Sequence, residues 1–174
     1  MWLKLDLSGI RLSMRIKNYR KTSEEDWLSV WCKTDFSFVA DKWLNYCEND
    51  GEVFLAREIE DLAKSLDDLL NDRLDAPTEF NCMEPDFNFV LTPKQDVRLN
   101  PKVLYVRPGC EIVDIDMEWK ISFWHDGLTA NYLSVTLDRT DIESLLLYLR
   151  LVMGELQKTA PEIKVLMDKG IISS

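Results

Sequence analysis

Carboxylates are the side chains of this sequence whose number and spacing indicate chemistry, and that chemistry is the recognition of a cation. The chain carries 31 Asp and Glu against 21 Lys and Arg, which gives a formal net charge of -10. A field of this sign attracts a basic partner and speeds the encounter. We expect partner-binding residues in three acidic groups, which are Glu48, Asp50 and Glu52; Asp67 and Asp68; and Asp114, Asp116 and Glu118.

Each acidic group also has a plain structural explanation. The first surrounds Gly51 in an expected turn, and it is the preferred candidate because loops carry recognition more often than helix flanks. The second lies on the exposed side of an expected helix, where acidic runs are usually solvated surface. The third alternates along an expected strand, so its carboxylates share one face at spacings of roughly 6–7 Å. Cross-strand neutralisation would explain the third group too. The basic strand face available for it carries Arg11, Arg15 and Lys17.

Catalytic motifs are absent from the sequence. The one histidine, His125, precedes Asp126 in an expected turn, which favours a polar turn residue. There is no Gly-x-Ser-x-Gly motif, no glycine-rich phosphate loop and no His-Glu-x-x-His motif. We therefore expect no enzyme and no cofactor, although the abundant acids leave a carboxylate-pair hydrolase open. The cysteines are too far apart for a CxxC metal knuckle, so we expect reduced thiols and no metal. They are Cys32, Cys47, Cys82 and Cys110.

Length and composition indicate one domain spanning residues 1–174. Hydrophobic residues make up 46% of the chain, enough for a substantial core. No apolar run is long enough to span a bilayer. The first residues alternate and include Asp6, unlike the apolar centre of a signal peptide, so we expect a cytoplasmic protein. The negative charge argues against nucleic acid as a direct partner, and self-association stays open.

Periodicity predicts strands in both halves and a helix after each. In the first half, alternation and aromatic or β-branched content predict strands over 3–7, 10–17, 27–38 and 39–47. A turn is expected at 48–51, and a first helix at about 56–73. In the second half, strands are predicted over 78–83, 86–91, 103–107, 112–124 and 131–137.

Local signals place the remaining boundaries of the second half. A loop is expected at 92–102, and Asp126-Gly127 predicts a hairpin turn. A second helix is expected at about 140–157, opened by a capping box of Thr140 and Glu143. A short helical tail at 161–169 should end at Gly170.

The order of these elements predicts an α+β fold, a mainly antiparallel sheet covered by two amphipathic helices. The segments 58–62 and 141–145 are alike, which fits either an internal duplication or the general similarity of amphipathic helices. Trp119 is expected in the core. Trp27 and Trp31 fit either the core or an exposed interface anchor.

An ordered set of elements resembles a known family. The set comprises Asp26-Trp27-Leu28-Ser29-Val30 in a strand, Glu58-Ile59-Glu60-Asp61-Leu62 in a helix, the segment Met83-Glu84-Pro85-Asp86-Phe87-Asn88-Phe89, and Asp141-Ile142-Glu143 opening the last long helix. In this order the elements resemble the WapI-type immunity proteins, the antitoxins of bacterial wall-associated polymorphic toxins. The similarity covers roughly residues 27–155, and its most distinctive part is Glu-Pro-Asp-Phe-Asn-Phe.

The resemblance implies a small cytoplasmic protein that binds its toxin domain, commonly a basic nuclease, and blocks it. It brings no catalytic or binding residues with it. The leading hypothesis is therefore an inhibitor that covers the active or substrate site of a cationic toxin domain, using acidic side chains around apolar anchors. A non-catalytic scaffold or self-associating domain is the second hypothesis, and a carboxylate-pair hydrolase is the third.

Overall fold

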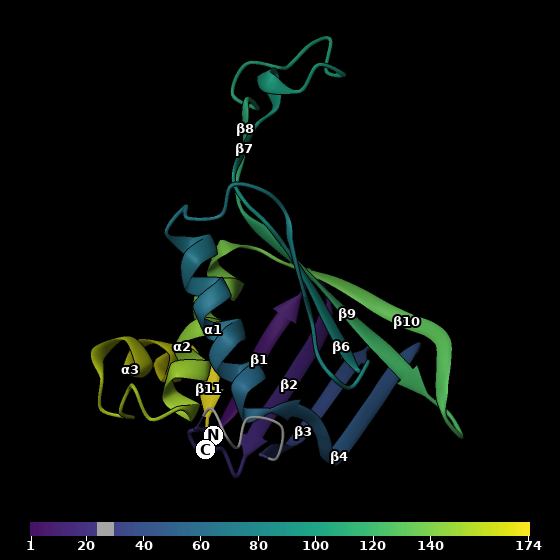
Figure 1. Ribbon diagram of the computed structural model, residues 1–174, viewed down its shortest axis with the longest axis vertical. Helices are drawn as coiled ribbons and strands as arrows, with labels where there is room; N and C mark the ends of the chain where they lie inside the picture. Colours follow the sequence, from purple (N-terminus) through teal and green to yellow (C-terminus); the bar gives the residue numbers. More distant parts are fainter. Residues whose placement is uncertain (24–29) are drawn as a thin grey trace.

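Two antiparallel sheets face each other and hold the core between them (Figure 1). The computed structural model describes residues 1–23 and 30–174. The first sheet has the order β11-β1-β2-β3-β4, with bounds Ile172–Ser173, Trp2–Leu7, Ile10–Lys17, Trp31–Ala40 and Leu44–Leu55. The second has the order β10-β9-β6-β5, with bounds Leu128–Leu137, Asp116–Trp124, Phe87–Thr92 and Thr78–Asn81. The predicted α+β class with mainly antiparallel strands is confirmed.

Both halves of the chain follow one topology. Strands β1 to β4 form a meander in sequence order, and helix α1 (Ala56–Leu70) follows. Strands β5, β6, β9 and β10 form a second meander, and helix α2 (Arg139–Val152) follows. The likeness of the two helices therefore extends to the strands before them, as an internal duplication would produce. The second half also carries a ribbon of β7 (Gln95–Asp96) and β8 (Ile112–Val113) between its second and third strands.

Aromatic side chains join the two sheets. Trp119 of β9 is fully buried, as predicted, and its ring meets that of Phe38 on β3 edge-on, with 5.8 Å between centroids. Phe87 of β6 contacts Phe36 of β3 at 5.1 Å and Phe54 of β4 at 5.3 Å between centroids. Apolar residues alternate with polar ones along these strands, so each sheet presents one apolar face to the other. Helices α1 and α2 contact each other beside this core (Figure 1).

The predicted turn at 48–51 was wrong, because this segment is a bulge inside the long strand β4. Thr34 and Phe36 of β3 pair with Gly51 and Glu48, so β4 carries one extra residue there. Asp50 takes a φ of 55° in this bulge. Polar residues and glycine favour positive φ in bulges as they do in turns, which explains why the local sequence indicated a turn. The chain instead reverses between Ala40 and Leu44.

Two strand predictions after β6 were also wrong. Residues 103–107 form no strand, and the predicted strand 112–124 is interrupted at Asp114 and Ile115, which separate β8 from β9. Residues 27–29 of the predicted strand 27–38, which include Trp27, lie outside the described residues. Strand β3 begins at Trp31. The hairpin turn between β9 and β10 is confirmed: the His125 N–H donates to the Gly127 carbonyl at 2.9 Å.

The predicted capping box of α2 was wrong by two residues. The cap is Asp138, whose Oδ1 accepts a hydrogen bond from the Asp141 N–H at 3.0 Å, while Asp141 Oδ2 accepts from the Asp138 N–H at 3.4 Å. Thr140 lies inside the helix. The short helix α3 (Pro161–Asp168) follows, and Gly170 ends it as predicted, with a φ of 73°.

Removal of this cap should destabilise the protein. Asp138→Ala deletes the acceptor for the Asp141 N–H, so we expect the free energy of unfolding to fall by about 1 kcal/mol. Urea unfolding followed by far-UV circular dichroism measures the change. Glu143→Ala is the matched control, because Glu143 is exposed on the same helix and takes no part in the observed box. The assignment of the cap would be contradicted by equal losses in the two variants.

Candidate partner-binding site

A pocket of about 390 Å³ opens where the edge strand β4 meets the second sheet. Its lining side chains come from β3 and β4 on one side, and from the β5–β6 connection and the end of β9 on the other. Tyr46 of β4 links the two sheets here, since its ring centroid lies 4.7 Å from that of Phe123 on β9. We call this site the acidic pocket and define it by the carboxylates Glu48, Glu52, Glu84 and Asp86 and the aromatic side chains Trp31, Tyr46 and Trp124.

The acidic pocket has an excess of negative charge. Within the described part of the chain one ion pair reaches it, from Lys33 Nζ to Glu52 at 2.7 Å. Burial raises the pKa of Asp86, a hydrogen bond from the Trp124 side chain opposes this change, and the charges of Glu84 and Glu48 raise the pKa further. Like charges therefore repel one another in this pocket, and a cation brought into it would be stabilised.

The composition of the acidic pocket suits a guanidinium or an ammonium group. Carboxylates accept charge-assisted hydrogen bonds from such groups, and Arg forms two parallel ones. Aromatic faces attract the same cations through the ring quadrupole. The half-buried rings of Trp31 and Tyr46 and the more exposed ring of Trp124 line the space that holds the carboxylates. A basic side chain, Arg or Lys, is therefore the kind of group that this geometry fits.

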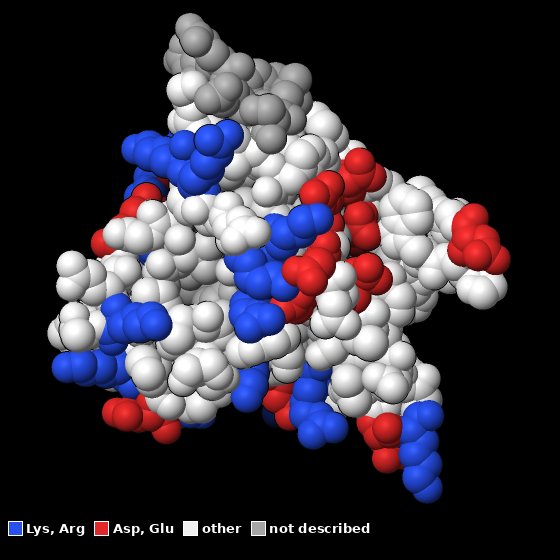
Figure 2. Space-filling model, turned by 90° about the horizontal axis from the view of Figure 1, so that it is seen from below, with Lys and Arg blue, Asp and Glu red and all other residues white. Residues whose placement is uncertain are grey.

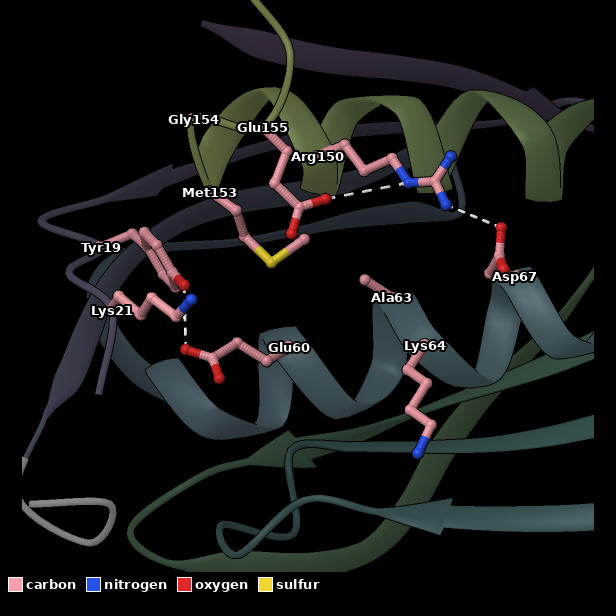
Figure 3. Close-up of a pocket in the computed structure, with 10 residues that line it drawn as sticks. All are labelled: Tyr19, Lys21, Glu60, Ala63, Lys64, Asp67, Arg150, Met153, Gly154 and Glu155. Carbon is pink, nitrogen blue, oxygen red and sulfur yellow. Dashed lines mark hydrogen bonds and ion pairs between the residues drawn. The ribbon is translucent and has the colours of Figure 1, made fainter. Parts of the chain in front are cut away.

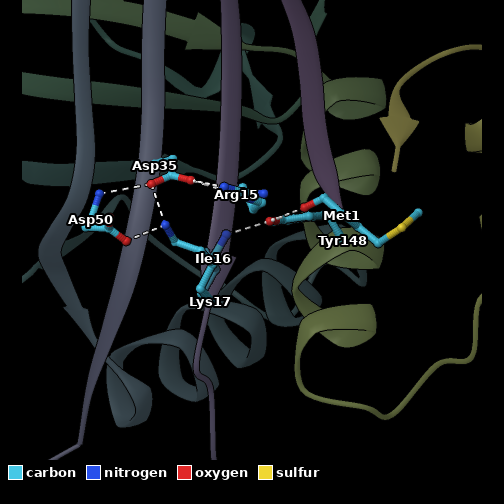
Figure 4. A network of polar contacts seen from close by, with 7 residues as sticks. All are labelled: Met1, Arg15, Ile16, Lys17, Asp35, Asp50 and Tyr148. Carbon is cyan, nitrogen blue, oxygen red and sulfur yellow. Dashed lines mark hydrogen bonds and ion pairs between the residues drawn. The ribbon is translucent and has the colours of Figure 1, made fainter.

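The first predicted acidic group divides between this pocket and a neighbouring ion-pair network. Glu48 and Glu52 line the pocket, whereas Asp50 accepts a hydrogen bond from Lys17 Nζ at 2.5 Å (Figure 4). Lys17 also donates to the buried Asp35 at 2.6 Å, and Arg15 Nη2 donates to Asp35 at 2.5 Å. Figure 4 shows these groups on adjacent strands of the first sheet.

This network corrects the suggested pairing of the basic face of β2 with the third acidic group. Strands β2 and β9 belong to different sheets whose apolar faces meet, so their polar faces are directed away from each other. Asp114 instead binds Arg139 at the start of α2, with 2.9 Å to Nη2. Glu118 accepts a hydrogen bond from the Ser134 hydroxyl at 2.5 Å, and Asp116 begins β9. The pKa of Asp114 is lowered to about 2, chiefly by Arg139.

Of the second predicted group, Asp67 lines another pocket, of about 360 Å³, between α1 and α2 (Figure 3), and Asp68 lies outside its lining. Asp67 points toward Arg150 of α2, with 2.7 Å from Oδ1 to Nη2, and it also pairs with Arg73. Asp68 pairs with Arg73 at 2.6 Å. These carboxylates already have cationic partners within the chain, so this pocket is less suited than the acidic pocket to a cation from outside.

Acidic and basic side chains also lie next to each other on the surface. Figure 2 shows a large group of acidic side chains next to basic side chains on the face seen from below, and smaller acidic groups near the edges of that face, several of them also next to basic side chains. Internal pairing of this kind reduces the number of carboxylates that a partner can meet. The net charge of -10 therefore sets the long-range field, whereas the acidic pocket is a local site where a cation can bind.

Reasoning from the sequence does not identify four residues of the acidic pocket as recognition residues, which are Tyr46, Glu84, Asp86 and Trp124. By sequence Trp31 fits either the core or an exposed interface anchor, and the structure places it, half-buried, in the lining of the pocket. Glu84 and Asp86 carried a signal, since they belong to the most distinctive segment of the family resemblance, Glu-Pro-Asp-Phe-Asn-Phe. That segment connects β5 to β6 and brings its carboxylates against β4.

Comparison with known proteins defines the class of the molecule. The model of the immunity protein WapI-like family matches residues 3–156, which is most of the chain. The chain therefore belongs to the WapI-like immunity protein family, as its sequence elements predicted. No curated protein and no solved structure is significantly similar to it. Within residues 1–23 and 30–174, no helix has the length and apolar character needed to cross a bilayer.

Proposed function

We propose that this protein is a cytoplasmic inhibitor that neutralises a cationic, nuclease-like toxin domain by covering its active or substrate site. The family supports the role of immunity protein, and it favours a binding protein over an enzyme. The acidic pocket is the observation that carries the finer proposal, because its carboxylates and aromatic rings fit a basic side chain of a partner.

The proposed mechanism combines long-range attraction with one local anchor. The net charge of the chain draws a basic domain toward it and raises the association rate. An Arg or Lys of the toxin then enters the acidic pocket, between the carboxylates of Glu48 and Glu84 and the rings of Tyr46 and Trp124. Basic side chains of a nuclease bind phosphate, so sequestering one of them would also remove it from the substrate site.

The test is neutralisation of a toxin domain, if one is encoded beside the gene for this protein. Co-expression should restore growth of cells that produce the toxin domain, and the purified proteins should form a stable complex by calorimetry. An unrelated immunity protein is the control. Failure to bind the adjacent toxin and failure to restore growth would together reject the proposal.

Salt should act mainly on the association of this complex. We expect the association rate constant to fall steeply as the ionic strength rises, because the attraction acts at long range and is screened. The dissociation rate constant should change little, since the anchored groups are in contact. Stopped-flow mixing over a series of NaCl concentrations measures both constants. An association rate that does not respond to salt would show that the charge of the chain does not guide the toxin.

A further inference from the structure

An arm made of residues 93–115 projects from the body of the protein (Figure 1). The β7–β8 ribbon forms its stem, with Gln95 paired to Val113 and Asp96 to Ile112, and a 3-10 turn (Val97–Leu99) follows β7. Figure 1 shows its outer part well beyond the two sheets and the helices. The arm interrupts the second meander between β6 and β9, so the fold of that half does not require it.

The outer part of the arm exposes large apolar side chains. Leu104 is 99% exposed, Leu99 is 82% exposed and Tyr105 is 78% exposed. Local hydrogen bonds hold the loop in shape without covering these side chains: the Val97 N–H donates to the Glu111 carbonyl at 2.9 Å, and the Val103 N–H to the Asn100 carbonyl at 3.0 Å. Apolar groups presented in this way on a projecting element are typical of anchors for a partner surface.

The charge next to these anchors is opposite to that of the body. Lys102 and Arg107 are exposed on either side of Leu104 and Tyr105. At the base of the outer part, Arg98 is already paired with Asp96 at 2.5 Å. The tip is therefore apolar, aromatic and positive in a chain whose net charge is -10. A surface that accepts it has to combine apolar or aromatic contact area with carboxylates.

The acidic pocket has that composition, and it lies at the opposite end of β9 from the arm. Asp116, the first residue of β9, follows the arm, whereas Trp124, the last residue of β9, lines the pocket. A strand of this length separates its two ends by roughly 26 Å. The arm leads away from the body at the start of β9, so it does not reach the pocket of its own chain. The arm and the acidic pocket can therefore meet only between two copies of the protein.

We propose that the arm of one copy docks in the acidic pocket of a second copy, with Tyr105 and Leu104 against the aromatic rings and Lys102 or Arg107 against the carboxylates. The contact is heterologous, head to tail. The positive arm should bind a cationic toxin more weakly than it binds another copy of this acidic chain. This comparison rests on the proposed function. Self-association and toxin binding would then use the same pocket and exclude each other.

Sedimentation velocity of the full chain without toxin tests the proposal. The wild-type protein should show a sedimentation coefficient that rises from micromolar toward millimolar concentration. The arm variant Leu104→Ser/Tyr105→Ser and the pocket variant Glu48→Lys/Glu84→Lys should each stay monomeric over the same range. Both variants alter side chains outside the buried core, and circular dichroism checks that each is folded. A wild-type protein that stays monomeric throughout, or an arm variant that associates as wild type does, would overturn the proposal.

A mixture of the two variants provides the sharper measurement. The intact arm of the pocket variant can dock in the intact pocket of the arm variant, so an equimolar mixture should form a one-to-one dimer and nothing larger. Absence of this dimer when both variants are folded and the wild-type protein associates would also overturn the proposal. The arm variant should keep its affinity for the toxin, so failure of self-docking and failure of the proposed function give different results.

Discussion

Charge reversal in the acidic pocket, as Glu48→Lys/Glu84→Lys, is expected to weaken binding of the cognate toxin domain on the order of 1,000-fold. Glu48 is exposed and Glu84 is half-buried at the pocket, and each would face a basic group of the partner. Loss of one desolvated charge pair at an interface costs about 2–5 kcal/mol, and a lysine adds repulsion. A total loss of about 4 kcal/mol in binding free energy corresponds to an increase in Kd of roughly 1,000-fold.

Titration calorimetry at one fixed salt concentration measures this loss. The matched control is Asp75→Lys/Asp168→Lys, which changes the net charge by the same amount at two exposed acids outside the pocket lining. The control should lose affinity only through slower association, by less than about 10-fold. An equal loss in both variants would show that the overall field, rather than the acidic pocket, binds the toxin.

Replacement of Asp35 by Asn should cause the largest loss of stability that we expect from a polar site. Asp35 is 3% exposed and accepts hydrogen bonds from Arg15, Lys17 and the Asp50 N–H, the last at 2.9 Å (Figure 4). Removing one member of a buried ion pair costs about 3–5 kcal/mol. Because Arg15 and Lys17 keep partial access to water, we expect about 3 kcal/mol, the lower end of that range.

The pH dependence of this loss has a defined sign. Burial raises the pKa of Asp35, but hydrogen bonds from Lys17, the Asp50 N–H and Arg15 together lower it to about 2. A folded-state pKa below the unfolded value means that the charged form stabilises the fold. This contribution is complete above about pH 4 and is lost as the pH falls toward 2. The difference in unfolding free energy between wild type and Asp35→Asn should therefore shrink over this window.

Denaturant unfolding at several pH values measures that difference. Asp50→Asn is the matched control, since Asp50 bonds the same Lys17 but its side chain is 69% exposed. An exposed ion pair contributes about 0–1 kcal/mol, so the control should change little. If the two variants lost the same stability, the buried position of Asp35 would not be the source of the effect.

Local patterns in the sequence determined the class of the fold and its main elements. Period-2 alternation located β1 and β2, helical spacing located α1 and α2, and Asp126-Gly127 located the hairpin. Trp119 was correctly expected in the core. These predictions succeed because the periodicity of buried positions within one element is a property of that element alone. The bulge in β4 was mistaken for a turn because both use the same local backbone conformations.

Tertiary structure decided which acids have partners within the chain. Asp35 meets Arg15 and Lys17 across adjacent strands, and Asp67 meets Arg150 from a helix 83 residues further along. The acidic pocket is likewise formed by distant segments, because its lining comes from β3, β4, the β5–β6 connection and the end of β9. The sequence by itself determined the net charge, the two helices and the family. The distribution of that charge between internal pairs and a free pocket depends on contacts between distant segments, and only the packing of the two sheets brings those segments together.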